Sequence, residues 1–131
     1  MRPARARFLH TSIFVNDMRE SIAFYTEQLG LELLGGPHHY PGNADMAFIG
    51  ASWDAYIELV YDLEDHKPYD FGTRVEHLAL EVNDLDGLLA SLCASGASVM
   101  SGPKADPEGM RRIAFIVDTN GIPVELLEKR A

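Results

Sequence analysis

Residues 9–17 read LHTSIFVND, and residues 76–84 read EHLALEVND. The two stretches place His10 opposite His77, and both end in the triplet Val-Asn-Asp. Each stretch is a short β-favouring run followed by an aspartate, the kind of residue that caps a helix. The chain therefore contains a strand-to-helix unit that occurs twice.

The repeat continues beyond these stretches, at the same offset that separates His10 from His77. Two copies are too few for a solenoid, and they predict instead a duplicated module that closes on itself. One histidine and one glutamate from each copy would then surround a pseudo-twofold axis. The further aligned pairs are Ala23 with Ala90, residues 47–49 with 114–116, Glu58 with Glu125, and Leu59 with Leu126.

The first copy predicts a βαβββ unit. Residues 8–15 alternate as a strand, and a helix is expected to begin at Asp17 and to end at Gly30. Residues 36–43 are rich in glycine and proline, which predicts a loop that suits a flexible lid around His38-His39. The remaining strands are predicted at residues 31–34, 46–49 and 56–61.

The second copy repeats this order, and the fold class is therefore α+β with two paired βαβββ modules, at about residues 6–62 and 74–128 of a single domain spanning residues 1–131. The acidic stretch 63–73 is expected to link the modules, and Asn120-Gly121 predicts a tight turn. The elements expected in the second copy are a strand at 75–82, a helix at 84–95 before Gly96, and strands at 98–100, 112–117 and 123–127.

Composition excludes several classes of function. The 131 residues are 47% hydrophobic, enough for one compact domain, and no apolar run approaches the roughly 20 residues that span a membrane. The start MRPARARF lacks the apolar segment of a secretion signal, so we expect a soluble cytoplasmic protein. A net charge of −9 argues against a nucleic-acid partner, which needs a basic surface.

The single cysteine suits a reducing compartment and excludes a disulfide within the chain. Cys93 follows several leucines in the second predicted helix, and it is expected to be a buried, inert thiol.

Side-chain alternation predicts where the repeated histidines and glutamates point, because residues i and i+2 of a strand share a face. Glu58 lies between two apolar residues, Ile57 and Leu59, which are expected to pack under the helix. The same alternation applies to the other three positions. We therefore expect four side chains to face one concave space: His10, Glu58, His77 and Glu125.

These four residues form a candidate metal site. An unpaired carboxylate inside an apolar strand is costly, and a cation compensates that cost. Two imidazoles and two carboxylates make a charge-neutral site for a divalent ion, and such N and O ligands suit Ni, Co, Zn, Mn or Fe. The lack of a thiolate ligand argues against a closed structural zinc site.

Over nearly its whole length the chain carries motifs of a known superfamily. They are Leu9-His10-Thr11, residues 19–25 leading to Leu29-Gly30, Ile57-Glu58-Leu59, residues 76–80 and residues 124–127. By these motifs the chain resembles the vicinal-oxygen-chelate superfamily and, within it, the short bacterial glyoxalase I (lactoylglutathione lyase). The His/Glu/His/Glu order differs from the epimerases, which typically offer Gln at the second ligand place, and from the three-ligand dioxygenases and fosfomycin-type transferases.

The resemblance implies the glyoxalase/bleomycin-resistance/dioxygenase fold and a homodimer with sites between subunits. His10 and Glu58 would come from one chain, and His77 and Glu125 from the other. It implies one divalent metal per site, with Ni or Co preferred over Zn in short members. The implied reaction converts the hemithioacetal of methylglyoxal and a thiol into a 2-hydroxyacyl thioester, with Glu125 as the first choice for the base and Glu58 as its counterpart.

Two positions depart from the glutathione-dependent members. Where those members place an arginine four residues after the first ligand, this chain has Phe14, and where they place an asparagine four residues after the second, it has Asp62. Both changes are expected to weaken the binding of anionic glutathione. The sequence therefore leaves open whether the thiol substrate is glutathione or another thiol. The candidate replacement cations are Arg74, Lys104, Arg111 and Arg112.

Two other classes of function stay open. An epimerase, isomerase or lyase of the same superfamily would share the metal and the first step, removal of a proton beside a carbonyl. A binding protein would hold a metal or a small molecule without turnover.

Overall fold

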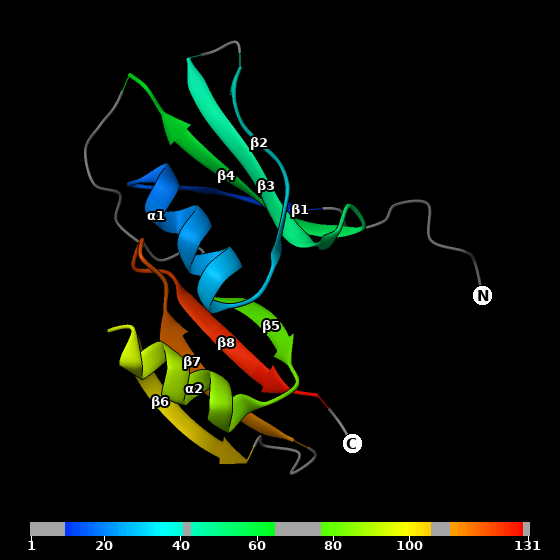
Figure 1. Ribbon diagram of the computed structural model, residues 1–131, viewed down its shortest axis with the longest axis vertical. Coiled ribbons are helices and arrows are strands. Elements are labelled where there is room, and N and C mark those ends of the chain that lie inside the picture. The colour runs from blue at the N-terminus through cyan, green and yellow to red at the C-terminus, as the bar shows by residue number, and fades with distance from the viewer. Residues whose placement is uncertain (1–9, 41–42, 65–76, 106–110, 130–131) are drawn as a thin grey trace, which may run out of the picture. The chain divides into compact units, whose positions relative to one another are not determined.

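The computed structural model describes residues 10–40, 43–64, 77–105 and 111–129, and it divides the chain into two compact units, Met1–Tyr69 and Asp70–Ala131. Each unit contains a four-stranded sheet with a helical segment against it (Figure 1). The repeated βαβββ order and the α+β class are confirmed. The elements are β1 (His10–Phe14), α1 (Met18–Ala23), η1 (Phe24–Gln28), β2 (Glu32–Tyr40), β3 (Ala44–Ser52) and β4 (Ala55–Asp62), then β5 (Leu78–Val82), α2 (Leu85–Ala94), β6 (Ser98–Ala105), β7 (Arg112–Val117) and β8 (Pro123–Glu128).

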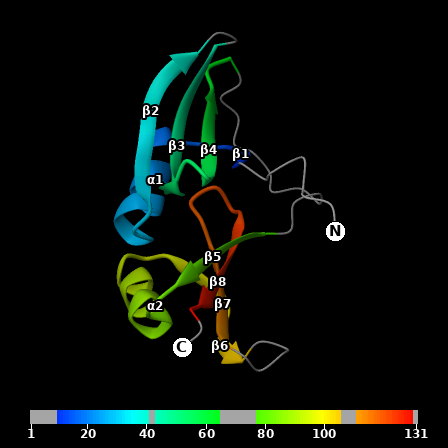
Figure 2. The ribbon, with the colours of Figure 1, turned by 90° about the vertical axis from the view of Figure 1, so that its right-hand side faces the viewer.

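The two sheets have the same topology. Their strand orders are β1-β4-β3-β2 and β5-β8-β7-β6, and Figure 2 shows β2, β3 and β4 side by side. In each sheet the first strand pairs in parallel with the last, whereas the other neighbours are antiparallel. A parallel pair needs a long crossover connection, and here the helix and two strands supply it.

Both helices begin and end as the sequence predicts. Asp17 and Asp84 are the N-caps: the Asp17 carboxylate accepts a hydrogen bond of 2.8 Å from the backbone N–H of Glu20, and the Asp84 carboxylate accepts one of 3.0 Å from Gly87. Gly30 and Gly96 follow the helical segments with φ of 76° and 87°, the left-handed conformation typical of a helix stop. The first helical segment ends in a π-helical turn, η1.

The strands β2 and β6 are longer than predicted. The prediction of a flexible loop at residues 36–43 is wrong for residues 36–40, which lie in β2, and residues 41–42 lie outside the described residues. Their pairing with β3 and β7 is interrupted by register shifts and then resumes, so that His38 and His39 lie within β2. Each irregularity contains a Gly-Pro step, Gly36-Pro37 or Gly102-Pro103. Both strands lie at a sheet edge. Proline has no backbone N–H to donate, and an edge strand with a bulge tolerates this missing hydrogen bond.

Only glycine fits at the two bulges. Gly36 has φ of 81°, and a Cβ added there would lie 2.5 Å from the carbonyl oxygen of Met46. Gly102 has φ of 88°, and its added Cβ would lie 2.7 Å from the carbonyl oxygen of Ile113. The close approach of the two backbones lets each edge strand continue past its proline.

The core of each unit lies between the helix and one face of the sheet. Val15, Tyr25 and Leu59 are fully buried in the first unit, as Leu92 and Leu126 are in the second. In β4 and β8 buried and partly exposed residues alternate, as predicted for strands with one face toward a helix. None of the helices within the described ranges has the length and apolar character that a membrane crossing requires.

The prediction that Cys93 is buried is wrong, and the predicted turn at Asn120-Gly121 is part of a longer turn. Cys93 is exposed, because the buried side of α2 is formed by Leu85, Leu89 and Leu92, and one further residue turns the side chain roughly 100° around the helix. The turn between β7 and β8 contains Asn120-Gly121 but spans residues 118–122, where Asp118 accepts hydrogen bonds from the backbone N–H groups of Asn120 and Ile122, both 2.8 Å. Most of the predicted linker at residues 63–73 lies outside the described residues.

We expect the equivalent substitutions Leu59→Ala and Leu126→Ala each to lower the free energy of unfolding by about 2–5 kcal/mol, since both side chains are fully buried. Urea denaturation followed by circular dichroism measures this change. Leu33→Ala, at a site that is 43% exposed, is the matched control, with an expected change of about 0.5 kcal/mol or less. A loss equal to the control in either core variant would contradict the assignment of that core.

Candidate metal centre

The parallel pairing of β1 with β4 brings His10 and Glu58 together. Ser12 lies in register with Glu58, and His10 lies in register with Tyr56. The His10 Nε2 atom is 3.6 Å from the Glu58 Oε2 atom, and the two side chains keep 31% and 18% of their surface exposed. A histidine and a glutamate that are far apart in the sequence therefore form a half-buried pair.

The second unit contains an equivalent pair. His77 immediately precedes β5, and Glu125 on β8 lies in register with Ala79. The distance from His77 Nε2 to Glu125 Oε1 is 3.7 Å, and the exposed fractions are 29% and 18%. The duplication seen in the sequence thus extends to the geometry of the two pairs.

Each glutamate faces away from the helix of its own unit. Glu58 is partly exposed between Ile57 and Leu59, which are buried. Glu125 is likewise partly exposed between two buried residues, Val124 and Leu126. The face that carries each pair is therefore the open face of its sheet, as the alternation predicts.

The donor atoms fit a divalent metal. At 3.6 and 3.7 Å both nitrogen–oxygen pairs lie beyond the hydrogen-bond range of about 2.7–3.2 Å. Two ligand atoms that bind one metal at about 2.0–2.2 Å lie roughly 3.0–3.5 Å apart, so a small side-chain movement suffices. The other ring nitrogen of His10, Nδ1, is buried and has no hydrogen-bond partner among the described residues.

Each pair supplies only half of a four-ligand set. Among the residues that the structure describes, no group of three or more His, Cys, Asp or Glu side chains is suited to hold a metal ion. Each unit offers the same two donor groups, one imidazole and one carboxylate. A site with four protein ligands requires two such pairs.

The surroundings of the two pairs differ. The Ser12 hydroxyl donates a hydrogen bond of 2.8 Å to Glu58 Oε1. The His10 ring stacks on Tyr56 with centroids 4.8 Å apart, whereas His77 meets Phe115 edge-on at 5.3 Å. Sequence reasoning missed Ser12, although its place two residues after His10 on the same strand face was a signal that could have found it.

An aromatic surface continues from His10 across the first sheet. Tyr56 contacts Trp53 and Phe48 with ring centroids 5.1 and 6.0 Å apart, and Phe48 contacts Tyr40 at 6.3 Å. Trp53 is 51% exposed, so it is not a core residue. An apolar wall therefore adjoins the first pair.

Phe14 and Asp62 lie at the far end of the same strands. Alternation along β1 places Phe14 on the face of His10 and Ser12, and alternation along β4 places Asp62 on the face of Glu58. Phe14 is 54% exposed. The Asp62 carboxylate accepts a hydrogen bond of 2.9 Å from the backbone N–H of Glu64.

The candidate cations lie in different surroundings. Arg112 forms two hydrogen bonds with the Asp86 carboxylate, of 2.8 and 2.9 Å, and this pair gives it a structural role in competition with substrate binding. Arg111 Nη1 lies 3.5 Å from the carboxylate of Glu81. Lys104 is exposed on β6, and Arg74 lies outside the described residues.

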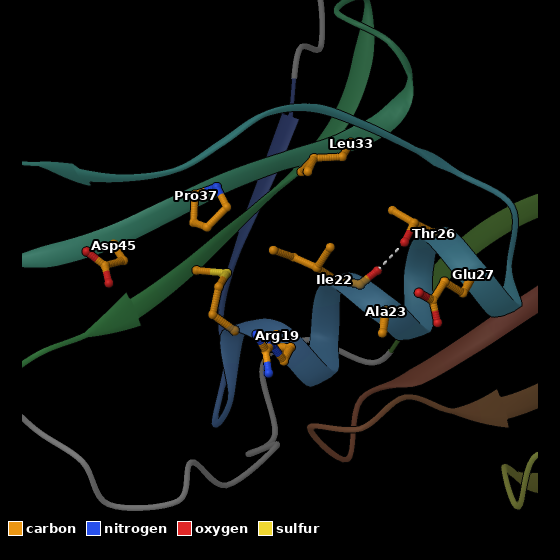
Figure 3. Close-up of a pocket in the computed structure, with 9 residues that line it drawn as sticks. Arg19, Ile22, Ala23, Thr26, Glu27, Leu33, Pro37 and Asp45 are labelled. Atoms are coloured by element: carbon orange, nitrogen blue, oxygen red, sulfur yellow. Dashed lines mark hydrogen bonds between the residues drawn. The ribbon is translucent and has the colours of Figure 1, made fainter.

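A pocket of about 460 Å³ lies on the other face of the first sheet, between α1 and the strands β2 and β3 (Figure 3). Asp45, at its rim, pairs with Tyr61 and so alternates to the face opposite Glu58. The pocket is therefore separate from the His10–Glu58 pair. Its other lining residues include Met18, Arg19, Ile22, Leu33 and Pro37.

The Asp86–Arg112 pair predicts a dependence of stability on pH. The hydrogen bond from Arg112 holds the pKa of Asp86 below its ordinary value of 3.8, and the same bond raises the pKa of Arg112. A lowered carboxylate pKa stabilises the fold above pH 3.8, and this contribution is lost as the pH falls through the lowered pKa. We expect Asp86→Asn to lower the melting temperature slightly at pH 7, since both groups are solvent-exposed, and to match the unsubstituted protein at the acid end of a pH series. An equal difference at every pH would contradict this origin.

Comparison with known proteins identifies a family whose members resemble this chain. Residues 7–126 match the model of the Glyoxalase/Bleomycin resistance protein/Dioxygenase superfamily. The chain is 33% identical over 130 residues to a probable lactoylglutathione lyase of Vibrio parahaemolyticus, an alignment that covers 97% of this chain and 94% of the relative. It is also 33% identical over 127 residues to the lactoylglutathione lyase of Escherichia coli O157:H7, covering 95% and 93% of the two chains.

A solved structure shows the same likeness. The trypanothione-dependent glyoxalase I of Leishmania major superposes with a TM-score of 0.81 at 30% sequence identity, covering 94% of this chain and 86% of that chain.

Proposed function

Because the chain belongs to the Glyoxalase/Bleomycin resistance protein/Dioxygenase superfamily, we propose that it is a metal-dependent lyase of the glyoxalase I kind. Its substrate would be the hemithioacetal of methylglyoxal and a thiol, and its product a 2-hydroxyacyl thioester. Relatives named lactoylglutathione lyase, which align with nearly the whole chain, support this reaction. The observation that carries the proposal is the duplicated His–Glu pair, with nitrogen–oxygen distances of 3.6 and 3.7 Å.

The metal ligands in this proposal are His10, Glu58, His77 and Glu125. Ni or Co is favoured by the likeness to short bacterial members, and the N and O donors also suit Zn, Mn or Fe. A divalent cation held by these residues would supply Lewis acidity to the substrate oxygens as negative charge develops on them.

The protein's own part is the movement of one proton. The hemithioacetal carbon that bears the sulfur loses a proton, and the neighbouring carbonyl carbon gains one. The hydroxyl proton on the first carbon's oxygen passes to the oxygen of the second carbon, so the reaction is an isomerisation that consumes no oxidant. A carboxylate beside the substrate accepts and returns the carbon-bound proton. We assign this role to Glu125, with Glu58 as its counterpart on the opposite side.

We further propose that the working form is a homodimer. His10 and Glu58 of one protomer and His77 and Glu125 of the other would complete each site. The supply of two ligands by each unit supports this arrangement. We also propose that both modules belong to a single domain that spans residues 1–131.

The thiol is the least constrained part of the substrate. Phe14 and Asp62 share the open face of the first pair and offer it an apolar side chain and an anion. Both oppose the binding of a carboxylate at this end of the sheet. Lys104 and Arg74 are the proposed contacts for an anionic thiol, which is glutathione or another. Arg112, the third proposed contact, would reach the thiol only by leaving Asp86 on the helix face of the second sheet.

We expect the metal-free protein to gain activity on methylglyoxal plus glutathione when Ni²⁺ or Co²⁺ is restored. Thioester formation measured by absorbance, alongside metal content, tests this expectation for Ni, Co, Zn and Mn in turn. Stoichiometric metal without thioester from glutathione or from a panel of other thiols would contradict the glyoxalase reaction. Racemisation of a 2-methylmalonyl thioester would then favour an epimerase, and no turnover a binding protein.

We expect Glu125→Gln to lower kcat by about 10²–10⁴-fold while bound metal is retained, because the amide cannot accept the proton. Glu81→Gln is the matched control, since Glu81 is an exposed glutamate that pairs with Arg111. Steady-state kinetics and metal analysis of both variants measure the difference. A kcat for Glu125→Gln equal to that of the control would exclude Glu125 as the base.

We expect the double substitution Phe14→Arg with Asp62→Asn to lower KM for the glutathione hemithioacetal by about tenfold, because it adds a cation and removes an anion beside the substrate's carboxylates. Phe14→Leu with Asp62→Asn is the control that lacks the cation. An unchanged KM would show that the thiol's carboxylates do not bind beside positions 14 and 62.

A further inference from the structure

The two His–Glu pairs allow a comparison inside one chain, because they share a fold but differ in the side chains around them. Ser12 lies in register with Glu58, and Ala79 lies in register with Glu125. The parallel strands and the His–Glu distances are otherwise alike. The difference between a hydroxyl and a methyl group is therefore the clearest asymmetry at the two glutamates.

The hydroxyl of Ser12 binds one carboxylate oxygen of Glu58, and the other oxygen faces His10. Ser12 Oγ donates to Glu58 Oε1 at 2.8 Å, a charge-assisted bond, while Oε2 faces His10 Nε2 at 3.6 Å. With one oxygen held, the carboxylate keeps a single orientation. Its free oxygen is the one that faces the imidazole.

Glu125 has a different neighbour at the same register. Its Oε1 atom faces His77 Nε2 at 3.7 Å, and the methyl group of Ala79 cannot donate a hydrogen bond. Its carboxylate can therefore rotate away from the imidazole without breaking a bond equivalent to that of Ser12.

We propose that Ser12 is a positioning residue that keeps Glu58 in place as a permanent ligand and leaves Glu125 as the mobile carboxylate. This inference rests on the proposed function and assigns the two glutamates different tasks. Glu58 holds its oxygen beside His10 throughout the reaction, which narrows the two candidate bases of the proposed function to Glu125 alone. Glu125 turns toward the substrate and takes the proton.

The hydroxyl is tested by a pair of variants with similar shape. Ser12→Thr keeps the hydroxyl, whereas Ser12→Val removes it, and both β-branched residues suit this exposed strand position. We expect Ser12→Val to bind Ni²⁺ about 10- to 100-fold more weakly than Ser12→Thr, measured by competition with a chromophoric chelator. Equal affinities of the two variants would overturn the proposal.

The reciprocal variant is Ala79→Ser, which offers Glu125 a hydroxyl like that of Ser12. We expect tighter Ni²⁺ binding together with a kcat about tenfold lower, a part of the roughly 10²–10⁴-fold that a positioned base contributes. KM should change little. A structural role alone would not move affinity and kcat in opposite directions, and an unchanged kcat would overturn the proposal.

Failure of the proposed function gives a different result. Unsubstituted protein that binds Ni²⁺ but turns over no hemithioacetal rejects the reaction, and the affinities of the Thr and Val variants then still decide the role of Ser12. Unsubstituted protein that binds no Ni²⁺ overturns both. Melting temperatures confirm that every variant is folded.

Discussion

The parallel pairing of the first and last strands of each unit is the constraint on which the rest of the structure depends. Parallel neighbours cannot be joined by a tight turn, so the helix and two further strands must lie between them in sequence. This arrangement places β1 beside β4 and β5 beside β8. It therefore brings His10 to Glu58 and His77 to Glu125, which no local segment of the chain could do.

The apolar core holds these strands in register. Leu59 and Leu126 are fully buried against the helices, and each follows a glutamate directly. A slip by one residue would expose the leucine and bury the carboxylate, at the cost of both apolar burial and charge desolvation. The packing that stabilises each sheet thus also sets the direction of Glu58 and Glu125.

The two units conserve their scaffold more closely than their surroundings. Both begin the helix with an aspartate cap, end the helical segment before a glycine, and carry a Gly-Pro bulge in the edge strand. Around the His–Glu pairs, however, Ser12 lies in register with Glu58 where Ala79 lies in register with Glu125, and His10 stacks on Tyr56 whereas His77 meets Phe115 edge-on. A duplicated frame can in this way hold two like pairs in unlike environments, which is what separate roles in one reaction require.

The sequence by itself determined the repeated βαβββ order, the helix caps at Asp17 and Asp84, and the faces of Glu58 and Glu125, because strand alternation and capping are local signals. Only the tertiary structure decided the rest. The continuation of β2 and β6 past their prolines, the Ser12–Glu58 hydrogen bond and the pairing of Arg112 with Asp86 depend on which distant segments become neighbours. The physical reason is that register between strands far apart in the chain is set by packing over the whole unit.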